Sequence, residues 1–257
     1  MMFDSSRRKL ARGKEHIRDL EREVGLFLQL NPYKRVFELN AERPGEFTCK
    51  IRLIQSLPSS LEMITGDAVT NLRAVLDHAM FAISRASGVN DPHNAYFPFS
   101  HSAETFENNM RGRCKDVPQE IYPFLRSLQP YPGGNTVLCI LNDLCNADKH
   151  RILTPIGTGA LRQGFSIRCN AIDRYFRAPI HHAWDRAKQE MVLFSVGGWQ
   201  PGDELDYEFD FHLFVALNEV QTVDGQPAVP VLNKLASEVE RILSALEAEA
   251  SRLGIGS

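Results

Sequence analysis

The sequence has 257 residues, of which 43% are hydrophobic and 24% charged, a balance typical of a globular chain with a substantial core. The formal net charge of −3 excludes a global attraction to nucleic acid or anionic membranes, so recognition of an anion would depend on a local patch. Five cysteines without a CxxC pair argue against a disulfide framework and against a structural zinc site.

The cysteine pattern favours a reducing compartment, and the rest of the sequence agrees with a cytoplasmic location. The basic start of the chain is followed by no apolar segment of the kind found in signal peptides. Nowhere do 18 apolar residues follow one another, so we expect no membrane-spanning helix.

Residues 5–30 carry hydrophobic side chains at helical spacing and predict a first helix that ends at Asn31-Pro32. Its opening is strongly basic, which the helix dipole disfavours unless an acidic partner lies close. One explanation is a solvated face or pairing with the acidic final helix, and the other is an arm that binds nucleic acid. The basic residues are Arg7, Arg8, Lys9, Arg12 and Lys14.

Residues 33–39 and 47–53 indicate a β-hairpin, because the second segment alternates hydrophobic and polar residues with the period of a half-buried strand. Residues 61–86 then predict the central helix, with one broad hydrophobic face. Hydrophobic residues also interrupt its polar side, so we expect this helix to be covered on most sides. Its charged groups then need partners, because an unpaired buried charge is costly.

Residues 87–99 are typical of a loop, and three further helices are expected over residues 103–112, 118–127 and 136–150. If the last of these continues regularly, Asp148 and Arg151 project onto its hydrophobic face, whereas His150 projects with Asn146 on another side.

The pattern then changes to strands, expected at residues 152–156, 165–172, 191–196 and 205–217. The last strand exposes Asp206, Glu208 and Asp210 on one face. We hypothesise that these carboxylates lie opposite Lys50 and Arg52 in one antiparallel sheet.

The predicted fold class is α+β, with a central helical unit packed on an antiparallel β-sheet built from strands before and after it, plus N- and C-terminal helices. We expect one integrated domain over residues 1–257, because the strands on both sides of the helical unit share a sheet. Its predicted parts are a helical unit at 57–151, strands at 33–54 and 152–217, and terminal helices at 5–30 and 229–253.

Polar residues that could carry chemistry concentrate in two segments. The central helix has Asn71, Arg73, Asp77 and His78, and the end of the 136–150 helix has Asn146, Asp148, Lys149, His150 and Arg151. In a structural interpretation, Asp148 accepts from Arg73 while Asp77 accepts from His150 or Arg151, which locks two core helices.

A functional interpretation uses the same residues to cleave a phosphodiester. One histidine acts as base and the other as acid, while Arg73 or Lys149 stabilises the pentavalent phosphorane. A pair of histidines that titrate near neutrality suits this chemistry.

Arg73-Ala-Val-Leu-Asp77-His78 resembles the Arg-x4-6-His signature of HEPN domains, helical units of which many are metal-independent endoribonucleases in toxin–antitoxin, phage-defence and RNA-processing systems. The wider pattern GDAVTNLRAVLDH with LNDLCNADKHR is similar to an uncharacterised bacterial family, over residues 66–151. The resemblance implies that Arg73 contacts phosphate and that His78 takes part in cleavage, commonly at a dimer interface. Members that cleave RNA often have a polar residue after the arginine, where this chain has Ala74.

The leading hypothesis is therefore an RNA-binding protein or metal-independent endoribonuclease with Arg73, His78 and His150 as catalytic residues. It implies RNA and a second copy as partners, leaves any antitoxin partner unidentified, and needs neither metal nor cofactor. Two alternatives stay open: a non-catalytic module whose polar network only locks the core, and a nucleotide or small-molecule binding protein. A metal site at His181, His182 and Asp185 is less favoured than a solvated loop.

Overall fold

The chain forms two groups of elements, which a computed structural model describes over residues 2–40, 42–147, 153–161, 166–168, 175–177, 183–198, 204–206, 209–218 and 220–256. The helical unit comprises Met1–Arg22, Ser59–Ile152 and Leu217–Ser257, and the sheet unit comprises Glu23–Pro58 and Leu153–Ala216. Helices and an antiparallel sheet coexist, which confirms the predicted α+β class. The expectation of a single integrated domain stays a prediction.

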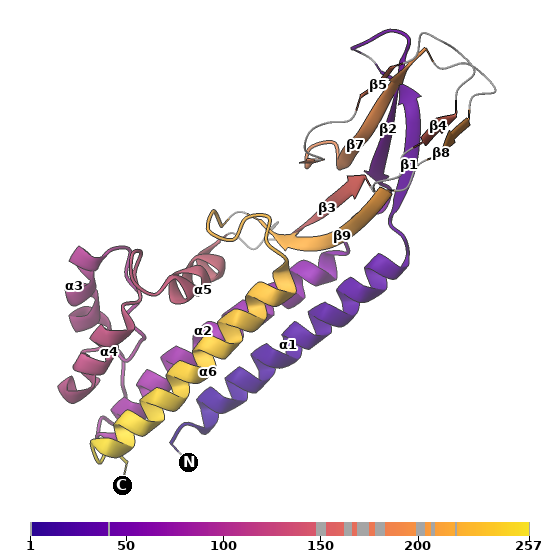
Figure 1. Ribbon diagram of the computed structural model, residues 1–257. Helices are drawn as coiled ribbons and strands as arrows, with labels where there is room; N and C mark the ends of the chain where they lie inside the picture. Colours follow the sequence, from indigo (N-terminus) through magenta and orange to yellow (C-terminus); the bar gives the residue numbers. More distant parts are fainter. Residues whose placement is uncertain are drawn as a thin grey trace. The chain divides into compact units, whose positions relative to one another are not determined.

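Three long helices run side by side in the helical unit: α1 (Asp4–Gln29), α2 (Ser59–Ala86) and α6 (Ala228–Arg252) (Figure 1). α1 runs antiparallel to α6, because Arg7 pairs with Glu247 and Lys14 with Glu240. These two ion pairs favour the acidic final helix as the partner of the basic start of α1. The helical unit also contains α3 (Ala103–Arg113), the short η1 (Gln119–Ile121), α4 (Tyr122–Leu128) and α5 (Thr136–Asn146).

The core of the helical unit lies along α2, whose hydrophobic face is buried as its spacing predicts, except at Ile64, which is half-buried. Asn135 caps α5 by accepting from the N–H groups of Val137 and Leu138. One prediction is wrong here: the helix expected to reach His150 ends at Asn146, and Ala147 is extended with ψ 140°. An asparagine side chain competes for backbone hydrogen bonds and so favours a helix end over a helix interior. The projection of Asp148 onto the α5 face therefore has no basis.

In the sheet unit, β2 (Glu46–Leu53) pairs antiparallel with β1 (Tyr33–Leu39) on one side and with β7 (Glu190–Gly197) on the other (Figure 1). β7 also pairs with β5 (Tyr175–Arg177) and β6 (Trp184–Asp185). One face of β2 and β7 forms a hydrophobic core with Cys49, Ile51, Met191, Leu193, Phe194 and Val196. Strands from before and after the central helix thus share one sheet, as predicted.

The expected strand at 205–217 is described as β8 (Glu204–Asp206) and β9 (Phe209–Leu217), and residues 207 and 208 lie outside the described residues. β8 pairs with β4 (Ser166–Arg168), and β9 pairs with β3 (Leu153–Leu161). The hypothesis that Asp206 and Asp210 lie opposite Lys50 and Arg52 is wrong, because β2 has β1 and β7 as its neighbours.

A close approach of α1 to α2 requires glycine at position 13. A Cβ atom added at Gly13 would lie 3.0 Å from Leu72 Cδ2, and Leu72 is fully buried. Gly13→Leu is expected to lower the free energy of unfolding by about 1–3 kcal/mol through overpacking. Gly66→Ala is the matched control, because nothing lies within 4 Å of its Cβ, and helix propensity predicts a gain of about 1 kcal/mol. Chemical denaturation of both variants measures the two changes, and a neutral Gly13→Leu would contradict this packing.

Candidate functional site

A pocket of about 820 Å³ lies beside the C-terminal half of α2. Its α2 wall has the spacing i, i+3, i+4 and i+7 of one helix face, with His78, Phe81, Ala82 and Arg85. Ser5 at the start of α1 and Tyr96 in the loop after α2 form other walls. The residues Phe81 and Tyr96 are 46% and 49% exposed, so two aromatic residues are available to a ligand.

His78 is half-buried in this pocket, and its Nδ1 lies 2.7 Å from Ser5 Oγ. Burial lowers the pKa of His78, and the positive charge of Lys9 lowers this pKa further, against the opposing charge of Asp77. The imidazole is therefore neutral at neutral pH. If the Ser5 hydroxyl accepts from Nδ1–H, Nε2 keeps a lone pair that can accept a proton.

Asp77 lies next to His78 in the chain, and its carboxylate holds the loop that follows α2. Its Oδ1 accepts from the Phe97 N–H at 2.9 Å. Burial raises the pKa of Asp77, whereas the Phe97 hydrogen bond and the charges of Arg73 and Arg113 act in the opposite direction. Asp77 thereby fixes the loop that carries Tyr96 into the pocket.

Arg73 lies on another side of α2 and contacts α5 and the loop. Its Nη1 donates to Asn142 Oδ1 at 2.5 Å and to Asn146 Oδ1 at 3.5 Å. Its guanidinium carbon stands 4.7 Å from the centre of the Phe99 ring, within cation–π range. In this arrangement Arg73 joins α2 to α5.

The predicted residues therefore divide between two places. Arg73 and Asn146 meet where α2 contacts α5, whereas His78 faces the pocket next to α1. Asn71 is near α1 as well, because it accepts from Lys9 Nζ at 3.3 Å. The predicted residues Asp148, Lys149, His150 and Arg151 lie outside the described residues, as do His181 and His182.

Sequence reasoning missed several residues of the pocket, namely Ser5, Phe81, Arg85 and Tyr96. Ser5 and Tyr96 come from elements far from α2 in the sequence, so no local pattern indicates them. A usable signal existed for Phe81 and Arg85, which follow His78 at i+3 and i+7 and so share its helix face.

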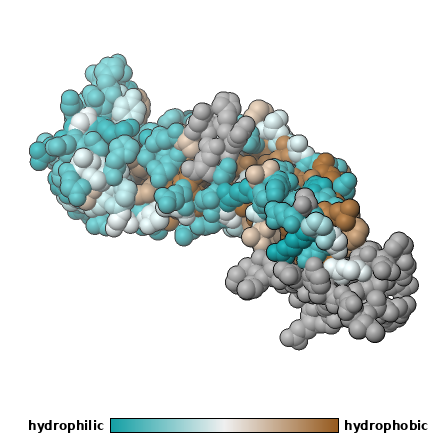
Figure 2. All heavy atoms as spheres, turned by 90° about the horizontal axis from the view of Figure 1, so that it is seen from above, coloured by the Kyte–Doolittle hydropathy of each residue, from teal (hydrophilic) through white to brown (hydrophobic). Residues whose placement is uncertain are grey.

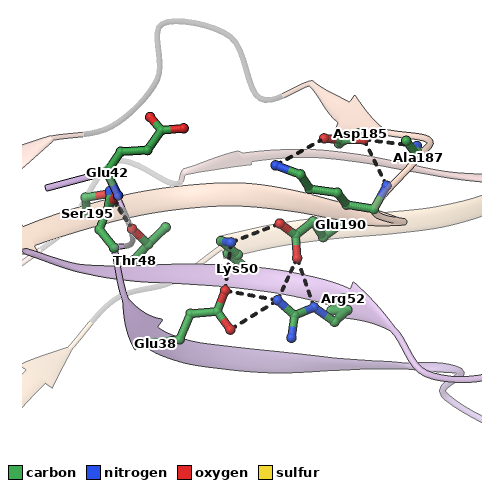
Figure 3. Close-up of polar contacts among 11 residues, drawn as sticks. Glu38, Glu42, Thr48, Lys50, Arg52, Asp185, Ala187, Glu190 and Ser195 are labelled. Atoms are coloured by element: carbon green, nitrogen blue, oxygen red, sulfur yellow. Dashed lines mark hydrogen bonds and ion pairs between the residues drawn. The ribbon is translucent and has the colours of Figure 1, made fainter.

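A second pocket, of about 450 Å³, lies on the sheet unit. It lies beside a network of ion pairs (Figure 3). Lys50 Nζ donates to Glu38 at 2.8 Å and to Glu190 at 2.9 Å, and Arg52 Nη2 donates to the same two carboxylates at 3.0 Å and 2.7 Å. Each charge is thus matched by an opposite one. The network explains how the sheet accommodates Glu190, whose side chain is only 7% exposed.

The described residues contain no group of three or more His, Cys, Asp or Glu side chains that could hold a metal ion. Burial raises the pKa of Cys114 to about 12, so this thiol is not a nucleophile near neutral pH.

In the part of the chain that is described, no helix has the length and hydrophobicity to cross a membrane.

Arg73→Ala is expected to lower the free energy of unfolding by about 1–3 kcal/mol, because it leaves the buried Asn142 amide oxygen without its donor. Arg85→Ala is the matched control on the same helix, since Arg85 is exposed and its removal should change stability by less than about 0.5 kcal/mol. Urea titration of the two variants gives both values. Equal losses of stability would contradict the joining role of Arg73.

Comparison of the chain with protein-family models, with curated proteins and with solved structures finds no significant match.

Proposed function

We propose that the protein binds RNA in the pocket at His78 and cleaves it without a metal ion, as the resemblance to HEPN domains implies. The observation that carries the proposal is a neutral imidazole in the wall of an open pocket that also offers exposed aromatic rings and positive charge. Aromatic side chains stack on unpaired bases, and cations attract the phosphates between them.

In the proposed reaction His78 removes the proton from a ribose 2′-hydroxyl, whose oxygen attacks the adjacent phosphorus. The bond from phosphorus to the 5′-oxygen breaks, and that oxygen takes a proton from water. The hydroxide that remains takes the proton held by His78, which restores the neutral imidazole, and the products are a 2′,3′-cyclic phosphate and a 5′-hydroxyl. Arg85 lines the pocket and is assigned to the phosphate, whose negative charge increases in the transition state. The bases stack on Phe81 and Tyr96.

Arg73 receives a different role in this proposal from the one that the resemblance implies. Its hydrogen bond to Asn142 and its contact with the Phe99 ring support a positioning role, in which Arg73 orients α5 and the loop next to the pocket. A phosphate contact by Arg73 would require the side chain to leave these partners. His150, which the sequence hypothesis names as catalytic, lies outside the described residues and is assigned no step in this reaction.

A second candidate function is binding of a nucleotide or another small anionic molecule in the same pocket. It is favoured by the pocket volume of about 820 Å³, which is within the range of small-molecule sites. The third possibility, a module whose polar groups only lock the core, is favoured by the contacts of Arg73 but leaves the open pocket unexplained.

Incubation of the purified protein with mixed-sequence RNA in EDTA separates these functions. The nuclease proposal expects fragments with 2′,3′-cyclic phosphate ends, and mass spectrometry identifies those ends. Nucleotide that remains bound after purification, without cleavage, would favour the second function. The absence of both cleavage and RNA binding would overturn the proposal.

A further inference from the structure

The basic residue Lys9 lies between α1 and α2, next to the residues that line the pocket of His78. Its Nζ donates to Asn71 Oδ1 at 3.3 Å, and Asn71 Nδ2 in turn donates to the backbone carbonyl of Asp67 at 2.8 Å. Ser5 meets His78 and Lys9 meets Asn71, so the two helices run antiparallel here (Figure 1). These contacts hold the ammonium on the surface that α1 and α2 share.

Lys9 differs from other cations of α1 in the partner that it has. Four cations of this helix form ion pairs with carboxylates at N–O distances of 2.7–2.9 Å, namely Arg7, Arg12, Lys14 and Arg22. Lys9 is half-buried, and its partner among the described residues is the Asn71 amide. An amide oxygen accepts a hydrogen bond but does not neutralise an ammonium, so the charge of Lys9 stays available to an anion.

Positive charge lies on both sides of His78 along α2. Asn71, His78 and Arg85 follow one another at intervals of seven residues, which puts them on one stripe of the helix with about 10 Å of rise between neighbours. Lys9 contacts the first of these residues, and Arg85 is the last. The charge of Lys9 also reaches the imidazole, since after burial it is the second cause that lowers the pKa of His78.

We propose that Lys9 binds a second phosphate of the RNA, next to the phosphate that is cleaved at His78. The inference rests on the proposed function, in which Arg85 contacts the scissile phosphate. Lys9 follows Ser5 by four residues, about 6 Å along α1, which is comparable to one nucleotide step of an RNA chain. The substrate is then an oligoribonucleotide with at least two phosphates, bound along the surface that α1 and α2 share.

The positive region ends one helix turn beyond Lys9. Asp67 is exposed at the position four residues before Asn71, and Arg12 is paired with Glu15. A third phosphate would therefore meet carboxylates, so the surface suits two phosphates and not a long polyanion, in agreement with the net charge of −3. On the face drawn in Figure 2 the helical unit is mostly hydrophilic, whereas hydrophobic surface gathers over the sheet unit.

The salt dependence of RNA binding tests this contact with the full chain. A short 2′-O-methyl oligoribonucleotide lacks the attacking hydroxyl, so its affinity is measured without cleavage. Lys9→Ala should weaken this affinity by about two- to fivefold and reduce the slope of its logarithm against the logarithm of salt concentration by about 0.7, the value for one phosphate. Lys14→Ala is the matched control, because Glu240 neutralises Lys14 at 2.7 Å, and its slope should stay unchanged. An unchanged slope in Lys9→Ala, as a purely structural role predicts, would overturn the proposal.

Small substrates test the requirement for a second phosphate. A dinucleoside monophosphate has the scissile phosphate only, and a terminal phosphate at its 5′ or 3′ end supplies the second. At about pH 8 the His78 imidazole is neutral with or without Lys9, so the comparison reports phosphate binding. The parent should cleave one of the two phosphorylated forms with a kcat/KM about two- to fivefold higher, and Lys9→Ala should lose this preference while Lys14→Ala keeps it.

The outcomes separate this inference from the proposed function. Cleavage of RNA with equal kcat/KM for the three small substrates, or with a preference that Lys9→Ala retains, overturns the inference alone. A parent that neither binds nor cleaves RNA overturns the proposed function, and the inference with it.

Discussion

His78→Ala is expected to reduce RNA cleavage by about 10²–10⁴-fold, the usual contribution of a general base. The variant loses the imidazole that would take the 2′-hydroxyl proton, while Phe81, Arg85 and Tyr96 still line the pocket. RNA affinity should therefore change much less than the cleavage rate. Single-turnover kinetics with saturating protein separates the rate from the affinity.

Ser5→Ala is the matched control for this variant. Both substitutions remove the hydrogen bond between Ser5 Oγ and His78 Nδ1, so both should cost about 1 kcal/mol of stability. Only His78→Ala also removes the base. If Ser5→Ala reduces cleavage as much as His78→Ala does, the imidazole acts through the structure of the pocket and not as the base.

The pH dependence of cleavage is a second test of His78 as the general base. Because burial and the charge of Lys9 lower the pKa of His78, the basic form predominates already below the ordinary value of 6.5. Cleavage should thus rise with pH, with the midpoint of the rise below pH 6.5. Lys9→Ala removes one of the two causes and should move the rise toward higher pH, whereas an unmoved profile would exclude His78 as the titrating group.

The sequence predicts the elements of the helical unit well because each carries its own hydrophobic period. The same geometry predicts that Arg73 and His78, five residues apart, point about 140° apart on a helix. The structure agrees, since Arg73 contacts α5 and His78 lies against α1. Which distant element would receive each side chain is not encoded in the helix itself, and for that reason Ser5 and Asn142 were missed.

The sheet unit shows what local sequence patterns do not predict, namely which strands become neighbours. Alternation within β2 correctly predicts that Lys50 and Arg52 share a polar face, but several strands carry carboxylates with the same period. The choice of partners depends on strand order, which forms over long sequence separations and leaves no local pattern. Glu38 and Glu190 therefore occupy the positions that the sequence interpretation gave to Asp206 and Asp210.

Glu190→Ala is expected to lower the free energy of unfolding by about 3 kcal/mol, near the lower limit for breaking a buried ion pair because Arg52 is one third exposed. The substitution removes the carboxylate that both Lys50 and Arg52 contact, and Lys50 is only 18% exposed. Glu42→Ala is the matched control in the same pocket, since Glu42 is exposed and should contribute less than about 0.5 kcal/mol. Chemical denaturation at neutral pH compares the two.

The network also predicts how stability depends on pH. Burial alone would raise the pKa of Glu190, but the hydrogen bonds and charges of Lys50 and Arg52 outweigh it and hold this pKa below the ordinary value of 4.5. A carboxylate with a lowered pKa binds fewer protons in the folded state than in the unfolded state. Its stabilisation is complete above pH 4.5 and is lost as pH falls through the lowered pKa. Glu190→Gln should show a shallower loss of stability over this acidic range.

In the Glu190→Ala variant, the effect of the lost charge can be separated from the effect of the lost side-chain volume. If unpaired positive charge dominates, Glu190→Leu combined with Lys50→Met should be more stable than Glu190→Leu alone, because the second change removes a charge that has lost one of its two partners. If lost packing dominates, Lys50→Met lowers the free energy of unfolding further. A double-mutant cycle with Lys50→Met alone gives the sign of the coupling. A coupling near zero would mean that Glu190 fills space in the sheet and that its charge is incidental to stability.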